Sequence, residues 1–195
     1  MLLEKLKNYK IILGSGSPRR QQLLEEMGIT FKVELIPVDE DFPAYLNPRE
    51  IAEYLSQRKA SAYDAARLTK NILLITADTI VTLGDKVLGK PSDRDDAIRI
   101  LNLLSGKPHE VITAVTLRSA QKSNTFSVST RVFFKELNGK EIDYYIDCYK
   151  PYDKAGAYGI QEWIGHAAIE KIEGSYFNVM GLPTHRLYEE LDQFL

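Results

Sequence analysis

Residues 11–20 read IILGSGSPRR and join an apolar run to a segment with the features of a helix start. Ser17 suits the N-cap position, and Pro18 fits the first helical position, where the backbone needs no N–H partner. The stretch therefore predicts a strand over residues 10–14 that turns directly into a helix over residues 17–27. This order of elements favours an α/β fold.

Arg19 and Arg20 contradict the local rules for the first turn of that helix. Two cations oppose the positive end of the helix dipole, and a capping box would have Glu or Gln at position 20. Such violations tend to mark functional sites. The simplest compensation is a bound anion, phosphate above all, held by backbone N–H groups and guanidinium forks. The alternative is a solvated helix start with two surface arginines.

The composition narrows the classes of protein. The chain has 195 residues, 44% hydrophobic and 27% charged, which is typical of a globular protein, and we expect a single domain over residues 1–195. Its net charge of −2 argues against general nucleic-acid binding, so any phosphate site must be a local basic cluster. The single cysteine, Cys148, excludes an internal disulfide and a multi-cysteine zinc site. Because no apolar run has signal-peptide or membrane-span length, we expect a cytoplasmic protein without a membrane partner.

Strand and helix patterns alternate along the rest of the chain, which indicates an α/β class. Strands are predicted over residues 31–38, 72–83, 86–88, 111–117, 125–134 and 163–172. Helices are predicted from the capping box at 47–50 to residue 66, from 92 or 93 to 106, over 141–148 and from Pro183 onward. The Gly-rich residues 153–159 predict a turn where the backbone approaches another group closely. Since neighbouring hairpins exclude a purely parallel sheet, we expect a mixed sheet with flanking helices.

Two charged residues fall where the hydrophobic pattern predicts burial. Asp78 lies in the apolar run 72–83, and a carboxylate there is costly unless a cation, a metal or hydrogen-bond donors satisfy it. Lys59 falls in the inward row of the helix that starts near residue 47, at helical spacing from Ile51 and Leu55. The functional interpretation gives each an oppositely charged partner or ligand. The alternatives are a strand that ends before Asp78 and a lysine that reaches solvent from the edge of the row.

Three further features are weaker candidates. The pair Asp39 and Glu40 follows a predicted strand, so one of the two side chains could point into a cleft and, with Asp78, hold Mg²⁺ or Mn²⁺, hard cations that take carboxylate oxygens. The alternative is an acidic pair in a surface loop. Pro91 in place of Ser or Thr excludes a P-loop, but Lys90, between a glycine and a proline, could serve as a rigidly placed phosphate contact. The amide of Gln161 can read the edge of a nucleobase through paired hydrogen bonds.

Taken in order, these motifs resemble the Maf family of nucleoside triphosphate pyrophosphatases over nearly the whole chain. The matching motifs are GSGSPRR (14–20), VDE (38–40), RKA (58–60), ADT (77–79), GKP (89–91), LSG (104–106), DKAGAYGIQ (153–161) and NVMGLP (178–183). The paired arginines, the threonine after Asp78 and DKAGAYGIQ are similar to the dTTP/UTP branch rather than the 7-methyl-GTP branch. The resemblance implies a mixed twisted β-sheet with flanking helices, in two lobes around an active-site cleft, as in inosine triphosphate pyrophosphatases. It also implies a homodimer.

The resemblance implies roles for the matching positions. The implied reaction is hydrolysis of dTTP and UTP to the monophosphate and pyrophosphate. Asp78 corresponds to the family's proposed proton acceptor. The resemblance also implies Mg²⁺ or Mn²⁺ near Glu40 and Asp78. Positions linked to base selectivity are Arg19, Thr79 and Gln161, and other active-site positions are Ser15, Arg20, Glu40, Lys59 and Lys90. Glu162 departs from the pattern, because the family usually has glycine there, and we expect it to reshape the base pocket.

Several alternatives stay open at this point. The substrate could be 7-methyl-GTP or another modified nucleotide, including a modified pyrimidine. A phosphotransferase is disfavoured by the failed P-loop, and a non-catalytic nucleotide-binding regulator of septum formation is disfavoured by the intact Glu40, Lys59, Asp78 and Lys90. The sequence also leaves open which of Glu40 and Asp78 binds metal and which acts as the base.

Overall fold

The structure, a computed structural model, describes residues 1–195 and divides the chain into two compact units. The first unit comprises Met1–Asp78, Thr113–Val128 and Gly181–Leu195, and the second comprises Thr79–Ile112 and Ser129–Met180. Three long strands contribute residues to both units: β3 (Ile72–Leu83), β5 (Pro108–Arg118) and β6 (Ser123–Phe134). No helix is long and apolar enough to cross a membrane.

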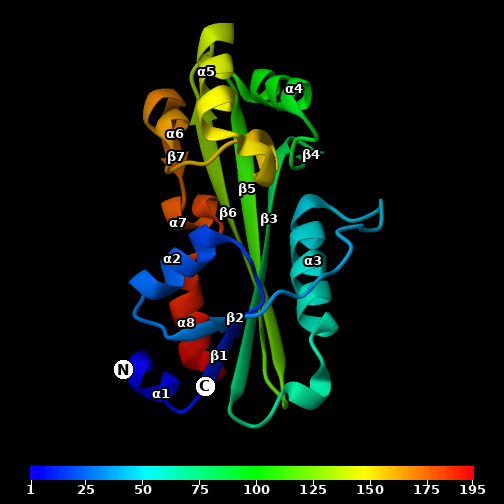
Figure 1. The fold of residues 1–195 in the computed structure, drawn as a ribbon, viewed down its shortest axis with the longest axis vertical. Coiled ribbons are helices and arrows are strands. Elements are labelled where there is room, and N and C mark those ends of the chain that lie inside the picture. Colours follow the sequence, from blue (N-terminus) through cyan, green and yellow to red (C-terminus); the bar gives the residue numbers. More distant parts are fainter. The chain divides into compact units, whose positions relative to one another are not determined.

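The strands form one seven-stranded sheet that the flanking helices cover (Figure 1). Its order is β2-β1-β3-β5-β6-β7, with β4 paired to β3. The remaining strands are β1 (Lys10–Leu13), β2 (Phe31–Val33), β4 (Lys86–Leu88) and β7 (Ile169–Glu173). β1 runs parallel to β2 and β3, whereas β4 is antiparallel to β3 and β7 is antiparallel to β6. The expected mixed sheet is therefore confirmed.

In the first unit, helices lie on both sides of the sheet (Figure 1). They are α1 (Leu2–Leu6), α2 (Pro18–Glu26), α3 (Pro48–Ala62), the short 3₁₀ helix η1 (Ala65–Arg67) and α8 (Thr184–Phe194). One core cluster joins the end of α3 to β1 and β3 through Ile12, Ala60, Tyr63, Leu68 and Leu74. Burial of these side chains fixes α3 against the strands.

Both ends of α3 are capped. At the N-terminus the predicted capping box is present, with Glu50 N–H donating to Asn47 Oδ1 at 3.0 Å and Asn47 N–H donating to Glu50 Oε2 at 2.9 Å. At the C-terminus the Arg118 guanidinium donates to the carbonyl oxygens of Ala60 and Tyr63 at 2.5 and 3.2 Å. These contacts fix the position along the strands of any side chain that α3 carries.

The second unit holds the remaining elements. They are β4, α4 (Arg94–Leu104), α5 (Gly139–Tyr149), the 3₁₀ helices η2 (Pro151–Asp153) and η3 (Ala155–Ala157), α6 (Trp163–Ala168), β7 and α7 (Tyr176–Met180). α4 contacts α5, and the buried residues of the two helices include Leu101 and Ile142.

The predicted close approach in residues 153–159 is confirmed at Gly156. Its φ is +71°, and its N–H donates to the carbonyl oxygen of Gly89 at 3.1 Å. A Cβ at this position would lie 2.9 Å from Val81 Cγ2, so only glycine fits without a shift of its neighbours.

Three boundary predictions were wrong. The strand predicted over 31–38 ends at Val33, because its only partner β1 ends at Leu13 and turns away. The strand predicted over 163–172 begins as helix α6, and only residues 169–173 pair in the sheet as β7. A short apolar run does not distinguish a buried strand from a short helix. The helix predicted to reach residue 66 ends at Ala62 and is followed by η1.

Candidate active site

The turn after β1 has the predicted local form. Ser17 is the N-cap of α2 with extended backbone angles, and Pro18 occupies the first helical position. The Ser17 side chain makes no capping hydrogen bond, and its N–H instead donates to Ser15 Oγ at 3.3 Å. A Cβ at Gly14 would lie 2.7 Å from Ile36 Cδ1 and 2.8 Å from Thr76 Cγ2. The glycine therefore lets the turn pack directly against β3.

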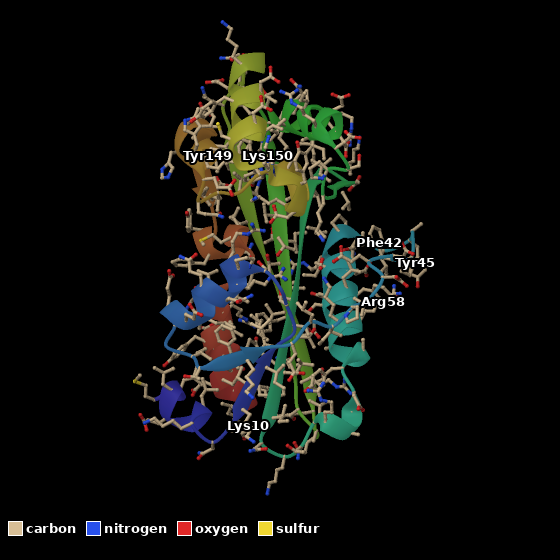
Figure 2. All side chains as sticks on the ribbon, viewed as in Figure 1. Lys10, Phe42, Tyr45, Arg58, Tyr149 and Lys150 are labelled. Atoms are coloured by element: carbon tan, nitrogen blue, oxygen red, sulfur yellow. The ribbon has the colours of Figure 1, made fainter.

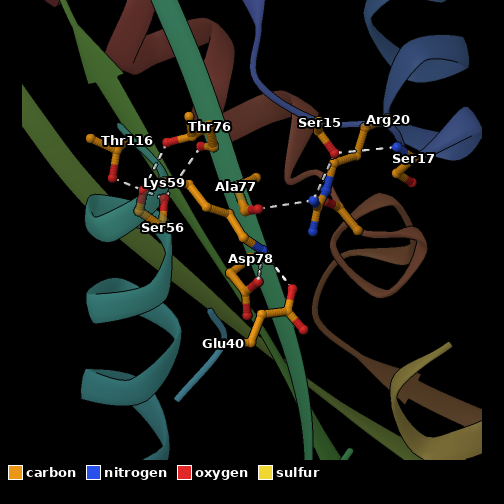
Figure 3. Close-up of polar contacts among 11 residues, drawn as sticks. Ser15, Ser17, Arg20, Glu40, Ser56, Lys59, Thr76, Ala77, Asp78 and Thr116 are labelled. Carbon is orange, nitrogen blue, oxygen red and sulfur yellow. Dashed lines mark hydrogen bonds and ion pairs between the residues drawn. The ribbon is translucent and has the colours of Figure 1, made fainter. Parts of the chain in front are cut away.

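Arg20 ties this turn to two other parts of the first unit (Figure 3). Its Nη1 donates to Ser15 Oγ at 3.1 Å and to the carbonyl oxygen of Ala77 at 2.9 Å, and its Nε donates to the carbonyl oxygen of Gly181 at 2.8 Å. The pKa of Arg20 is lowered overall, mainly because burial disfavours its charged form, and the charge of nearby Asp78 offsets part of this shift. Arg20 thus fixes the strand immediately before Asp78, a contact that the sequence did not indicate.

Asp78 lies inside β3 with 7% of its surface exposed, so the alternative of a strand that ends before it is wrong. Its cation is Lys59, whose Nζ lies 2.5 Å from Asp78 Oδ1 and 3.0 Å from Glu40 Oε1 (Figure 3). The Lys59 side chain is only 14% exposed, so the alternative of a lysine that reaches freely into solvent is also wrong. One ammonium group therefore joins two carboxylates from different elements, as the functional interpretation requires.

A set of hydroxyl contacts holds Lys59 opposite Asp78. Thr76 and Asp78 share one face of β3, and Ser56 and Lys59 share one face of α3. Thr76 Oγ1 donates to the carbonyl oxygen of Ser56 at 2.8 Å, and Ser56 Oγ donates to that of Thr76 at 3.3 Å. The Ser56 and Thr116 hydroxyls are also hydrogen-bonded to each other at 2.9 Å. The sequence analysis missed this network. Its signal is the spacing of the residues, because Thr76 lies two positions before Asp78 and Ser56 lies three positions before Lys59.

Glu40 reaches Lys59 from the loop between β2 and α3. The loop is held to the helix by Arg58, whose Nη1 donates to the carbonyl oxygen of Asp41 at 2.7 Å. Figure 2 labels Arg58 on α3 and the exposed aromatic residues Phe42 and Tyr45 on the loop. Glu40 itself keeps about half of its side chain in solvent. It is therefore the accessible carboxylate, and Asp78 is the buried one.

These two carboxylates suit a hard divalent cation that is shared with a substrate. The residues that the structure describes, 1–195, contain no group of three or more His, Cys, Asp or Glu side chains placed to hold a metal ion. Mg²⁺ is commonly bound through one or two carboxylates plus substrate phosphates, which needs no complete protein cage. Asp78 and Glu40 contact one ammonium group, so their oxygens already converge on a common cation position.

The second unit carries the other candidates. Thr79 is partly buried in β3, and Lys90 is exposed just after β4. Gln161 is partly buried, and its Oε1 is fully enclosed without a hydrogen-bond partner. A buried acceptor of this kind is costly to leave unpaired, which marks Gln161 as a residue that lacks its partner in the free protein.

A protein-family model described as "Maf-like protein" matches residues 10–194. The chain belongs to the Maf family. Three curated Maf relatives, each named "dTTP/UTP pyrophosphatase", are similar to this chain over nearly their whole length. The relative from Porphyromonas gingivalis is 50% identical, and the match covers 99% of this chain and 98% of the relative. The relative from Christiangramia forsetii is 51% identical, with 100% of this chain and 99% of the relative covered. The relative from Phocaeicola vulgatus is 52% identical, with 97% of this chain and 98% of the relative covered.

Among solved structures, the Maf chain is similar to "The structure of the Staphylococcus aureus Ham1 protein". The TM-score is 0.50 and the sequence identity is 12%. The structural match covers 93% of this chain and 99% of that chain. At this identity the likeness concerns the fold alone. It agrees with the expected α/β fold class.

The first unit brings together most of the positions that the Maf resemblance selects. Ser15 and Arg20 contact each other, and Lys59 contacts both Glu40 and Asp78. Arg19 lies in the same unit at the start of α2. The positions in the second unit are Thr79, Lys90 and Gln161.

Proposed function

We propose that this protein hydrolyses dTTP and UTP to the nucleoside monophosphate and pyrophosphate. The observation that carries the proposal is the pairing of buried Asp78 and accessible Glu40 around Lys59 in the first unit. The names of the similar Maf proteins support the substrate class. The proposal treats residues 1–195 as one Maf-like domain, which the extent of the matching family model supports.

In this mechanism Asp78 accepts the proton of a water molecule that attacks the α-phosphorus. The bond from the α-phosphorus to the bridging oxygen breaks, and pyrophosphate leaves with the electron pair. Lys59, Lys90 and Arg20 stabilise the negative charge that develops on the phosphate oxygens. Ser15, which accepts a hydrogen bond from Arg20, helps to bind the triphosphate through the turn before α2.

A divalent cation, Mg²⁺ or Mn²⁺, is part of the proposal. Glu40 and Asp78 would hold it, since both supply carboxylate oxygens that converge on one position. When bound, such a cation neutralises charge on the triphosphate and polarises its phosphoryl oxygens. Substitution of Glu40 and Asp78 in turn, with metal affinity and turnover measured for each, assigns the ligand and the base.

In this proposal the base is read by amide, hydroxyl and guanidinium groups. Thymine and uracil both present an N–H donor between two carbonyl acceptors, whereas the equivalent ring nitrogen of cytosine is an acceptor. The buried Oε1 of Gln161 is suited to accept from that N–H, and its amide nitrogen can donate to a neighbouring carbonyl. We assign Arg19 and Thr79 to the same selection of the base.

A substrate panel tests the proposal. The protein is incubated with Mg²⁺ or Mn²⁺ and each of the canonical and methylated triphosphates, and monophosphate and pyrophosphate are measured together. We expect equal amounts of both products, fastest from dTTP and UTP. Preference for 7-methyl-GTP would overturn the substrate assignment, release of orthophosphate with a diphosphate would overturn the reaction, and nucleotide binding without products would indicate a regulator.

Two further parts of the proposal concern the cell compartment and the oligomeric state. The single, exposed Cys148 suits the reducing cytoplasm. A homodimer follows from the family resemblance, and light scattering of the purified protein tests it.

A further inference from the structure

The carboxylate of Glu162 is committed to the turn that carries Gln161. Glu162 N–H donates to the carbonyl oxygen of Gly159 at 3.0 Å, which closes the turn over residues 159–162. Glu162 is also the N-cap residue of α6, but its side chain caps no N–H of that helix. A Cβ placed on Gly159 would have the Glu162 carboxylate carbon and both its oxygens as nearest atoms, at 2.9–3.1 Å. The side chain therefore folds back over the turn.

Tyr145 completes a closed ring of hydrogen bonds around the same turn. The Tyr145 hydroxyl donates to Glu162 Oε2 and accepts from Gly159 N–H at 2.9 Å. Tyr145 lies on α5 and is fully buried. The turn is thus fixed to α5 through both its first and its last residue.

A buried cation fixes the other carboxylate oxygen. Lys154 Nζ lies 3.3 Å from Glu162 Oε1, and the lysine is only 7% exposed. The second partner of Lys154 is Asp153, whose Oδ1 lies 2.8 Å from Lys154 Nζ and whose side chain is mostly exposed. A nearly buried ammonium needs a desolvated counter-charge, and Glu162 is the less exposed of its two carboxylate partners, so the ion pair also restrains the Glu162 side chain.

Gln161 lies between the two ends of this restrained turn. Its Oε1 is enclosed by protein and has no hydrogen-bond partner. An amide that could rotate freely would turn this oxygen toward a donor or toward water, because an unpaired buried acceptor costs free energy. The restrained turn fixes the backbone from which this unpaired oxygen projects.

We propose that Glu162 is a positioning residue that holds the Gln161 amide for a base with a ring N–H donor, and so sets the preference for thymine and uracil over cytosine. This inference rests on the proposed function, in which Gln161 contacts the base. Glu162 itself acts through the backbone turn and through Tyr145 and does not touch the substrate.

Variants of the ring test this assignment. Steady-state rates with dTTP, UTP and CTP are measured for the natural protein, Glu162→Ala, Tyr145→Phe and Glu162→Gln. We expect Glu162→Ala and Tyr145→Phe to lower the ratio of kcat/KM for dTTP over CTP about tenfold, mainly by raising KM for dTTP, as for loss of one positioned hydrogen bond. Glu162→Gln still accepts from Tyr145 but removes the counter-charge of Lys154, so the ratio should fall less than in Glu162→Ala.

Glu173→Gln is the matched control, because Glu173 is an exposed, ion-paired carboxylate of the same unit. It should leave the ratio unchanged. A merely structural role for Glu162 would lower the rates for all three nucleotides together and leave the ratio intact, and that result overturns the proposal.

Gly159→Ala supplies a second, independent test. Its new Cβ would displace the Glu162 carboxylate, so alone it should reduce the ratio as Glu162→Ala does. Combined with Glu162→Ala it should add no further loss, because the group it displaces is already absent. Additive losses would overturn the steric coupling on which the proposal depends.

A spectroscopic measurement separates this proposal from the proposed function. The Gln161 side-chain amide resonance of isotope-labelled protein reports its orientation without any substrate. We expect it to shift or broaden in Glu162→Ala and to be unchanged in Glu173→Gln. An unchanged resonance in Glu162→Ala refutes the positioning role even in an active enzyme, whereas failure of the natural protein to release pyrophosphate refutes only the proposed function.

Discussion

The buried histidine of the second unit gives a quantitative prediction about stability. His109 is 3% exposed, and its Nε2 is hydrogen-bonded to the Tyr158 hydroxyl at 2.8 Å. Its ring also meets the rings of Phe134 and Tyr158 edge-on, with centroids 4.9 and 5.4 Å away. Burial lowers the pKa of His109 from 6.5 to about 4, because a charged imidazolium is poorly solvated among these groups.

The direction of the pH effect follows from this lowered pKa. Between about pH 6.5 and pH 4 the unfolded chain binds a proton at position 109 that the folded chain does not bind. The contribution of neutral His109 to the free energy of unfolding is therefore fully present above about pH 6.5, and it is lost as the pH falls toward 4. The full difference corresponds to about 3 kcal/mol, since one pKa unit is worth about 1.4 kcal/mol.

Urea unfolding at a series of pH values tests the prediction in the natural protein and in His109→Phe. The variant leaves the Tyr158 hydroxyl without its partner, so its stability at neutral pH is expected to be lower. The informative quantity is the difference between the two curves, because both proteins share the titration of their carboxylates. We expect this difference to shrink by about 3 kcal/mol as the pH falls from about 7 to about 4. Parallel curves over this range would refute the reasoning.

Three other substitutions give measurable outcomes. Asp78→Asn should keep the fold by circular dichroism but lower pyrophosphate release from dTTP by about 100-fold or more, as for loss of a general base. A rate equal to that of the unmodified protein would exclude that role. Lys59→Ala leaves two carboxylates facing each other, so we expect the free energy of unfolding to fall by about 1–3 kcal/mol together with turnover. Higher stability with normal turnover would mean that the lysine is only tolerated. Gly156→Ala should cost about 1–3 kcal/mol in denaturant unfolding, because its Cβ would press on Val81 at positive φ, and a cost near zero would contradict this packing.

Local sequence signals predicted the parts of the fold that depend on neighbouring residues. The capping box at 47–50 and Pro18 after Ser17 each act within one helical turn, and both are present as predicted. The pairing of Asp78 with a cation was predictable because a carboxylate within an apolar strand is costly unless a partner satisfies it. Helix α6 was not predictable in this way, since its six residues are too few to show a helical period.

Contacts between distant residues set the rest of the site, and no local pattern predicts them. Arg20 donates to the carbonyl oxygen of Gly181, which lies 161 residues later in the chain. Ser56, Thr76 and Thr116 come from three separate elements and are ordinary residues within each of them. Their role emerges only when α3 and β3 lie together, because a hydroxyl is a weak local signal but a specific long-range contact.

The cations in unfavourable positions are satisfied in two different ways, and the difference bears on the chemistry. Arg20 donates to backbone and hydroxyl oxygens and lies within the field of the Asp78 and Glu40 charges, whereas Lys59 contacts both carboxylates directly. The trio of Lys59, Asp78 and Glu40 therefore has an excess of negative charge, which on its own repels a triphosphate. A triphosphate that arrives with a divalent cation instead complements the carboxylates through the cation and Arg20 through its oxygens. Triphosphate affinity should consequently rise when the cation is added, and Glu40→Gln should weaken that dependence by removing one of the two carboxylates.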